Sequence, residues 1–261
     1  MPCVFVVNLN YSKPLSDYLI SLADDELILG HRDSEWTGHA PILEEDIAFA
    51  NLALDEIGHA RLWYELGADL LGADPARFPD QQVYFRPAAD FRCLQFVELP
   101  KGDWAFSMVR QYLFDAFEQH RLAGLVESKH QPLADVAARI RTEELYHLRH
   151  TRAWVPRLGL GTEESRARMQ AALDELWPFA QALSAPLPGE LELREAGLVP
   201  GSSSLFDMWS GEVSMFLKEA GLQVPPGNND VEADRAVHSE YFPALIADLQ
   251  EVAQLDPEAQ W

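Results

Sequence analysis

Cysteine is scarce in this chain: Cys3 and Cys93 are the two cysteines among 261 residues. They form no Cys-x-x-Cys motif, so we expect neither a disulfide framework nor a thiolate zinc site. Cations are also few, with 20 Lys plus Arg against 42 Asp plus Glu and a formal net charge of −22. Because nucleic-acid affinity depends on clustered cations, no nucleic-acid partner is expected. The excess of acids suits a solvated surface or a basic protein partner.

Long apolar runs are missing as well. The run Val4 to Val7 is too short for a membrane span and no basic residue precedes it, so we expect no signal peptide, no membrane partner and a cytoplasmic location. The sequence contains no Gly-rich nucleotide-binding loop, no nucleophile elbow and no strand-like alternation. An apolar fraction of 48% is nevertheless enough for a packed core. The sequence therefore predicts a folded, helical protein.

Apolar residues recur at helical spacing through most of the chain. The first helix is expected to begin near Ser12, with Pro14 in its first turn. Four prolines then break the pattern between residues 72 and 101, a stretch long enough to cross a helical bundle. The predicted helices cover about 14–38, 41–71, 103–129, 132–158, 162–183, 190–197, 202–220 and 231–255.

Two Glu-x-x-His pairs interrupt the apolar faces of these helices: Glu56 with His59, and Glu144 with His147. Residues three apart lie on one helix face, so each pair directs a carboxylate and an imidazole to the same point. A single acid lies upstream of each pair, on the apolar face of the preceding helix: Glu26 is 30 positions before Glu56, and Asp115 is 29 positions before Glu144. The repeated spacing indicates two helical hairpins built around one centre.

These six residues are the predicted metal ligands. Carboxylates and imidazoles of this kind suit iron or manganese, and two adjacent ions with open positions can activate O2. The prediction is therefore an all-α, ferritin-like four-helix bundle with a long crossover between its second and third helices and additional C-terminal helices. Residues 1–12 are expected to be an N-terminal extension and residues 13–261 a single domain.

The sequence pattern alone leaves several points undecided. One Glu-x-x-His pair is expected by chance about once in a chain of this length, so the argument depends on both pairs and their upstream acids. Glu118, one turn after Asp115, is an alternative ligand. In the first hairpin, Glu26 and Glu56 differ in height by roughly 9 Å at 1.5 Å per residue before the turn is considered, whereas Asp115 and Glu144 match well.

Short motifs elsewhere carry a resemblance. They are Glu35 to Pro41, Ala50 to Asp55, Arg110 to Tyr112, Tyr146 to Arg149 and His238 to Glu240. In order and spacing, the chain from about Leu15 to Trp261 resembles the C subunits of the bacterial phenylacetyl-CoA 1,2-epoxidase, a multicomponent oxygenase of aerobic phenylacetate degradation.

The resemblance implies a ferritin-like subunit that pairs with a catalytic A subunit, which holds the di-iron centre and the CoA-ester substrate. It also implies a reductase subunit that uses flavin, an iron–sulfur cluster and NADPH. In that family the metal site of the C subunit is generally regarded as decayed. Here Glu26, Glu56, His59, Asp115, Glu144 and His147 form a full set. This departure puts in question whether the site lacks metal in this chain.

Three functions follow as hypotheses. The leading one is a structural subunit of the epoxidase complex, with iron or manganese in its own site as an open possibility and a homodimer as an open form of the isolated chain. The alternative is an autonomous di-iron or di-manganese carboxylate oxidase or oxygenase, which the complete set favours. An iron-storage protein is disfavoured, because the C-terminal helices would have to fit into a cage.

Overall fold

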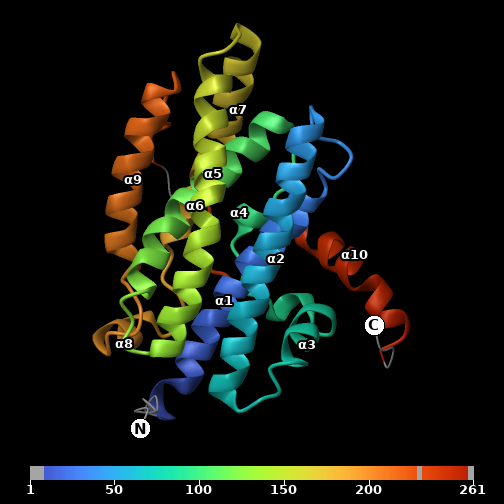
Figure 1. Ribbon diagram of the computed structural model, residues 1–261, viewed down its shortest axis with the longest axis vertical. Coiled ribbons are helices and arrows are strands. Elements are labelled where there is room, and N and C mark those ends of the chain that lie inside the picture. The colour runs from blue at the N-terminus through green and yellow to red at the C-terminus, as the bar shows by residue number, and fades with distance from the viewer. Residues whose placement is uncertain (1–8, 228–230, 258–261) are drawn as a thin grey trace.

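The computed structural model describes residues 9–227 and 231–257, and every regular element in these two ranges is a helix (Figure 1). Four long helices form the bundle: α1 (Leu9–Ser34), α2 (Leu43–Leu71), α5 (Trp104–Leu125) and α6 (Gln131–Gly159). Helix α1 packs along α2 and α5 packs along α6, while α2 and α6 also touch. The two predicted hairpins therefore form, and the chain has the ferritin-like, all-helical fold.

The connection between the hairpins is irregular, as its prolines predicted. It holds two short helices, α3 (Phe78–Tyr84) and α4 (Gln95–Glu98), and a 3-10 turn, η1 (Ala88–Asp90). Helix α3 packs on α2 and α4 packs on α1, so the crossover follows the first hairpin.

The C-terminal helices cover the outside of the bundle. They are α7 (Glu163–Ala180), the 3-10 turn η2 (Gln181–Ser184), α8 (Glu190–Glu195), α9 (Ser202–Glu219) and α10 (Phe242–Leu255). Helices α7 and α9 pack on α5, and α10 packs on α3 at the opposite side of the molecule (Figure 1). Among the described residues, no helix combines the length and the apolar character needed to cross a membrane.

Local capping explains several of the helix ends. The Asp103 side chain accepts a hydrogen bond from the Phe106 backbone N–H at 2.9 Å and so begins α5. Thr162, the expected start of α7, exchanges side-chain hydrogen bonds with Ser165 at 3.0 and 3.1 Å. Gly72 ends α2 at φ 68°, a conformation that glycine adopts without a Cβ penalty.

The predicted start of the first helix is wrong. Helix α1 begins at Leu9, so Pro14 lies inside it, and α1 ends at Ser34, before the expected stop at Gly38. Proline lacks an N–H, so the helix loses its bond to the carbonyl of Asn10 but continues. The division into a 1–12 extension and a 13–261 domain stays a prediction, and residues 1–8 lie outside the described ranges.

The predicted start of the last helix is also wrong, because α10 begins at Phe242 and not near residue 231. Arg235 and His238 bind the distant carboxylates of Asp25 and Glu98, at 2.8 and 2.6 Å. These long-range bonds anchor residues 231–241, which form turns and irregular backbone and no helix. Tertiary contacts here override the local helical pattern.

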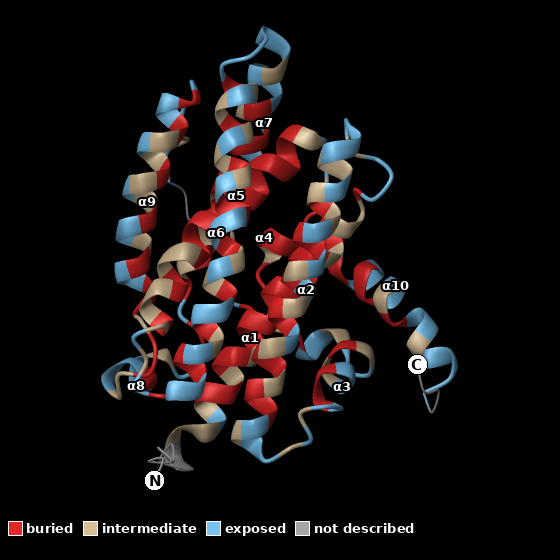
Figure 2. Ribbon diagram, in the orientation of Figure 1, coloured by how far each residue is buried: buried red, intermediate tan, exposed pale blue. Residues whose placement is uncertain are grey.

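The facing sides of the four long helices are buried; exposed residues follow the outer sides of α2 and α6, whereas α1 and α5 are covered on almost every side (Figure 2). Most of this interior is apolar, with Trp63, Tyr112 and Phe117 among its largest side chains. Charged groups buried among such residues need partners, since desolvation disfavours an isolated charge. The centre of the bundle holds several.

Candidate metal centre

All six predicted ligands meet in the middle of the bundle. Each is at most 1% exposed. They form two overlapping groups, in each of which one potential ligand atom per residue lies within 4.8 Å of the others. The first group is Glu26, Glu56, His59 and Glu144, and the second group is Glu56, Asp115, Glu144 and His147. Glu56 and Glu144 belong to both groups, as two carboxylates shared between adjacent metal positions would.

The first hairpin brings its acids together despite the height difference that the sequence indicated. Gly30 lies directly against α2, where an added Cβ would stand 2.9 Å from the Glu56 Cβ and 3.0 Å from the Ala53 carbonyl oxygen. Glu26 is one turn earlier, so it faces the next turn of α2, and its Oε2 is 3.7 Å from His59 Nδ1. The length of the glutamate side chains covers the remaining offset.

Both imidazoles direct Nδ1 inward and Nε2 outward. His59 Nδ1 is 3.4 Å from Glu144 Oε1, and His147 Nδ1 is 3.1 Å from the same atom. The outward nitrogens face two partly exposed acids: His59 Nε2 is 2.8 Å from Glu143 Oε2, and His147 Nε2 is 3.4 Å from Asp55 Oδ2. Carboxylates in this position orient imidazole ligands and raise their basicity.

The two outer acids had a signal in the sequence that the prediction did not use. Asp55 directly precedes Glu56, and Glu143 directly precedes Glu144, so α2 and α6 both read acid-Glu-x-x-His. Glu143 points away from the interior of its own helix pair, with a side chain 39% exposed. It nevertheless reaches the histidine of α2, a contact that only the crossing of the two helices creates.

Burial and mutual repulsion change the protonation of this centre. Desolvation and the charge of Glu144 raise the pKa of Glu56 well above its usual value, and the pKa of Asp115 rises for the same reasons. Burial opposes the charged form of His59, yet Glu144 and Glu26 beside it raise its pKa to about 11. Burial likewise opposes ionisation of Glu144, but His147 and His59 lower its pKa to about 2. Protons therefore neutralise the centre, and a metal ion would have to displace them.

Two further side chains, Gln111 and Thr151, join the second group. Gln111 Nε2 donates to Glu56 Oε1 and to Asp115 Oδ1, both at 2.8 Å, and the Thr151 hydroxyl donates to Asp115 Oδ2 at 3.0 Å. Gln111 is four residues before Asp115, and Thr151 is four after His147, so both share a helix face with a predicted ligand. That spacing is the signal by which the sequence could have indicated them.

Glu118, the alternative to Asp115, belongs to neither group. Its carboxylate forms an ion pair with Arg121, which also makes a 3.3 Å hydrogen bond to the Leu183 carbonyl. Asp115 is therefore the α5 acid that reaches the centre.

The first group suits a metal ion because some of its buried polar atoms lack a hydrogen-bond partner within the described ranges. Each of its residues has one buried side-chain atom without a hydrogen-bond partner among the described residues; these atoms are Glu26 Oε2, Glu56 Oε2, His59 Nδ1 and Glu144 Oε2. Buried polar atoms in native proteins are normally paired, and a cation held by one ligand atom from each of these residues would supply a partner that the described residues do not. Iron and manganese suit such a mixed set.

A third cluster lies apart from this centre and has a different character. Glu98 accepts hydrogen bonds from His238 Nδ1 and from the Ser239 backbone N–H, both at 2.6 Å, and Cys93 Sγ is 3.4 Å from the same carboxylate. Both oxygens of Glu98 are thus used by protein donors. This cluster fastens residues 238–239 to α4.

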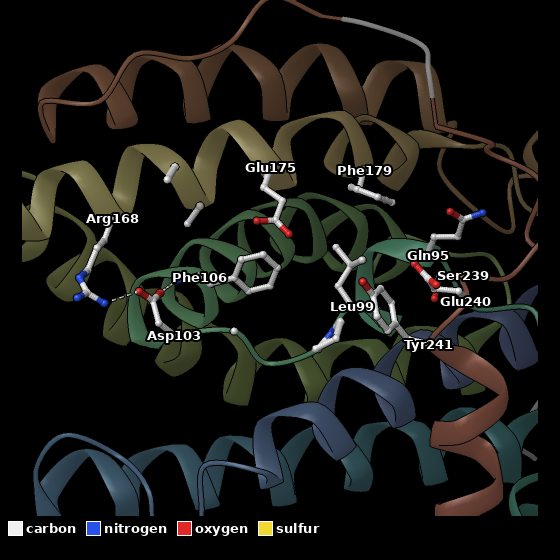
Figure 3. Close-up of a pocket in the computed structure, with 14 residues that line it drawn as sticks. Gln95, Leu99, Asp103, Phe106, Arg168, Glu175, Phe179, Ser239, Glu240 and Tyr241 are labelled. Atoms are coloured by element: carbon white, nitrogen blue, oxygen red, sulfur yellow. Dashed lines mark hydrogen bonds and ion pairs between the residues drawn. The ribbon is translucent and has the colours of Figure 1, made fainter.

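A cavity of about 640 Å³ opens between α7, the start of α5 and residues 239–241 (Figure 3). Phe106, Phe179 and Tyr241 line it together with Arg168 and Glu175. None of the six residues of the centre takes part in its walls. The cavity therefore gives a small molecule no contact with the centre.

Comparison with known proteins agrees with the fold. Residues 6–261 match the family model described as "Phenylacetic acid catabolic protein". The chain is 35% identical over 248 residues to the C subunit of the 1,2-phenylacetyl-CoA epoxidase of Escherichia coli (strain K12), and the match covers 95% of this chain and 99% of that protein. The resemblance read from the short motifs is thereby confirmed, and the chain belongs to the phenylacetic acid catabolic protein family.

Proposed function

We propose that this chain is a structural subunit of a phenylacetyl-CoA 1,2-epoxidase complex and that its own centre binds iron or manganese. Its partner is a catalytic A subunit, which holds the di-iron centre and the CoA ester and epoxidises the aromatic ring. A reductase supplies electrons from NADPH through flavin and an iron–sulfur cluster. The observation that carries the proposal is the 35% identity to the C subunit of an epoxidase along almost the full length of both chains.

Burial of the centre supports a division of labour between the subunits. The six residues are at most 1% exposed, and the cavity of Figure 3 does not touch them. A catalytic centre has to hold its substrate within contact distance of the reacting group. An aromatic thioester bound in that cavity would not reach the six residues, which favours ring oxidation in the partner.

The outer face of α2 supports a role inside a complex. Leu43, Ile47, Leu54 and Ile57 are between 40% and 72% exposed. At 100° per residue they lie within an arc of about 80°, so they form one stripe along the helix. We call these four residues the α2 stripe. Aligned apolar side chains on a surface are typical of protein contact sites.

Reconstitution tests the subunit role. The A subunit and the reductase are assayed for phenylacetyl-CoA turnover with and without this chain. We expect turnover to fall at least about tenfold without it, which corresponds to about 1.4 kcal/mol in the activation barrier. An inert protein at equal concentration is the control for non-specific stabilisation. Equal turnover in all three mixtures would refute the subunit role.

The six-residue set also favours a second candidate, an autonomous di-metal oxidase or oxygenase, although the comparisons do not. The isolated metal-loaded chain would then consume O2 in the presence of a chemical reductant and an organic substrate. Oxygen uptake no greater than that of a Glu56→Gln variant would exclude this candidate.

A further inference from the structure

The two groups of the centre differ in their hydrogen bonding. Every residue of the first group has a buried atom without a hydrogen-bond partner in the described ranges. In the second group, the two residues that belong to it alone are fully engaged. Asp115 accepts from Gln111 and Thr151 on its two oxygens, and His147 has Glu144 on one nitrogen and Asp55 on the other.

The amide of Gln111 occupies the place between the two carboxylates of the second group. Its nitrogen lies 2.8 Å from Glu56 Oε1 and 2.8 Å from Asp115 Oδ1, and it has one N–H for each. An ion that joined Glu56 to Asp115 would have to come within about 2.0–2.2 Å of carboxylate oxygens. An amide N–H₂ and a metal ion cannot share that position.

The amide presents its nitrogen to both carboxylates, and Gln111 Oε1 has no hydrogen-bond partner in the described ranges. Gln111 is fully buried on α5, so it has little space in which to move away. The first group contains no comparable donor.

We propose that this chain binds one divalent iron or manganese ion in the first group and that the Gln111 amide takes the place of a second ion. The proposal rests on metal binding by this chain and is independent of the subunit role, because it concerns the isolated protein. Glu56 and Glu144 then act as ligands to one ion, while their sides toward Asp115 and His147 are held by protein hydrogen bonds.

Metal content per chain is the test. The purified protein is stripped with a chelator, reloaded with Mn²⁺ and dialysed, and manganese is measured by mass spectrometry. We expect one ion per chain and the six-line electron paramagnetic resonance signal of an isolated Mn²⁺, without the multiline signal of a coupled pair. Two ions per chain would overturn the inference but leave metal binding intact. No bound ion would overturn both the inference and metal binding, and would leave the subunit role to the reconstitution assay.

Two variants separate the groups, because Glu26 belongs only to the first and Asp115 only to the second. Glu26→Gln should lose the ion and the rise in melting temperature that Mn²⁺ gives the wild type, since a ligand that binds the native state raises its stability. Asp115→Asn should keep both. Equal loss in the two variants would refute a one-ion site in the first group.

A third variant tests the role of the amide. Gln111→Ala removes the donor and should increase manganese toward two ions per chain, with the appearance of a coupled signal. Gln119→Ala, two turns along α5 and only partly buried, is the matched control and should keep one ion. Gln111→Ser, which is smaller and still polar, serves the same purpose where the alanine variant does not fold. One ion in a folded Gln111 variant would show that the amide does not exclude the second.

Discussion

Gly30 shows how one residue decides the distance between two helices. A Cβ there would meet Glu56 Cβ at 2.9 Å and the Ala53 carbonyl oxygen at 3.0 Å, and neither is the flexible end of a side chain. Gly58 is also inside a helix, but a Cβ there would meet no atom within 4 Å. Gly30 therefore allows α1 to pack closely on α2, whereas Gly58 makes no packing contact with the described residues.

We expect Gly30→Ala to destabilise the protein by about 1–3 kcal/mol, because α1 and α2 must move apart. Gly58→Ala should stabilise it by about 0.5–1 kcal/mol, since alanine loses less backbone entropy than glycine in a helix. Urea unfolding followed by circular dichroism measures both free energies. A shift of equal size and sign in the two variants would show that the close approach at Gly30 is not responsible.

Local sequence indicates some residues of the site and misses others. Glu56 with His59 and Glu144 with His147 were predicted because a spacing of three is a property of one helix. Asp55 and Glu143 were missed because each acts on the histidine of the other helix, at 3.4 and 2.8 Å. Contacts between helices depend on how the helices cross, which residue spacing does not encode.

At the scale of the element, α2 has two faces with different roles. One face carries Glu56 and His59 into the centre, and the other carries the α2 stripe outward. The helix therefore carries the α2 stripe on the side opposite the buried charges. Asp55, with a side chain 38% exposed, lies between the two and hydrogen-bonds His147.

We expect the double variant Ile47→Glu and Leu54→Glu to weaken binding of the A subunit at least about tenfold, or about 1.4 kcal/mol, because both side chains lose apolar contact. Its unfolding free energy should change by no more than about 0.5 kcal/mol, since both positions are exposed in the isolated chain. Affinity is measured by calorimetry with purified A subunit.

Leu160→Glu and Leu191→Glu are the matched controls for the α2 stripe, because these leucines are 64% and 61% exposed elsewhere on the surface. They should keep the affinity of the wild type. If the double variant binds the A subunit normally but no longer self-associates in sedimentation, the stripe is a homodimer contact and the prediction is wrong.

At the scale of the whole molecule, Arg235 links the C-terminal part of the chain to α1. Arg235 is 5% exposed and donates to Asp25 Oδ2 at 2.8 Å and to the Arg92 carbonyl at 2.9 Å. Burial raises the pKa of Asp25, although Arg235 opposes this shift. This ion pair joins residues 210 positions apart.

We expect Arg235→Met to destabilise the protein by about 3–5 kcal/mol, because Asp25 then remains buried without its partner. Adding Asp25→Asn should recover part of that loss, since no charge is left unpaired. Arg168→Met, which removes the ion pairs with Asp103 and Glu164 at a side chain 57% exposed, is the control and should change stability by about 1 kcal/mol or less. Guanidinium unfolding of the wild type, Arg235→Met, Asp25→Asn, their double variant and Arg168→Met provides the free energies. Additive effects of the Arg235 and Asp25 variants would contradict the coupling.

The helical class, the long helices and the proline-rich crossover could be predicted because they depend on local periodicity and on where proline interrupts it. The start of the first helix and the start of the last helix could not be predicted. Pro14 is tolerated inside α1, and residues 231–241 follow bonds from Arg235 and His238 to distant acids. The second outcome depends on interactions with elements far away in sequence.

By itself, the sequence determined that six potential ligands lie on inward helix faces, since residue type and helical spacing are sufficient for that. Only the tertiary structure decided how these ligands are used. It brings Glu26 to His59 through the close approach at Gly30, and it places the Gln111 amide between Glu56 and Asp115. The physical reason is range: helical spacing acts over a few residues, whereas a hydrogen bond or a metal ligand depends on distances between atoms of different helices.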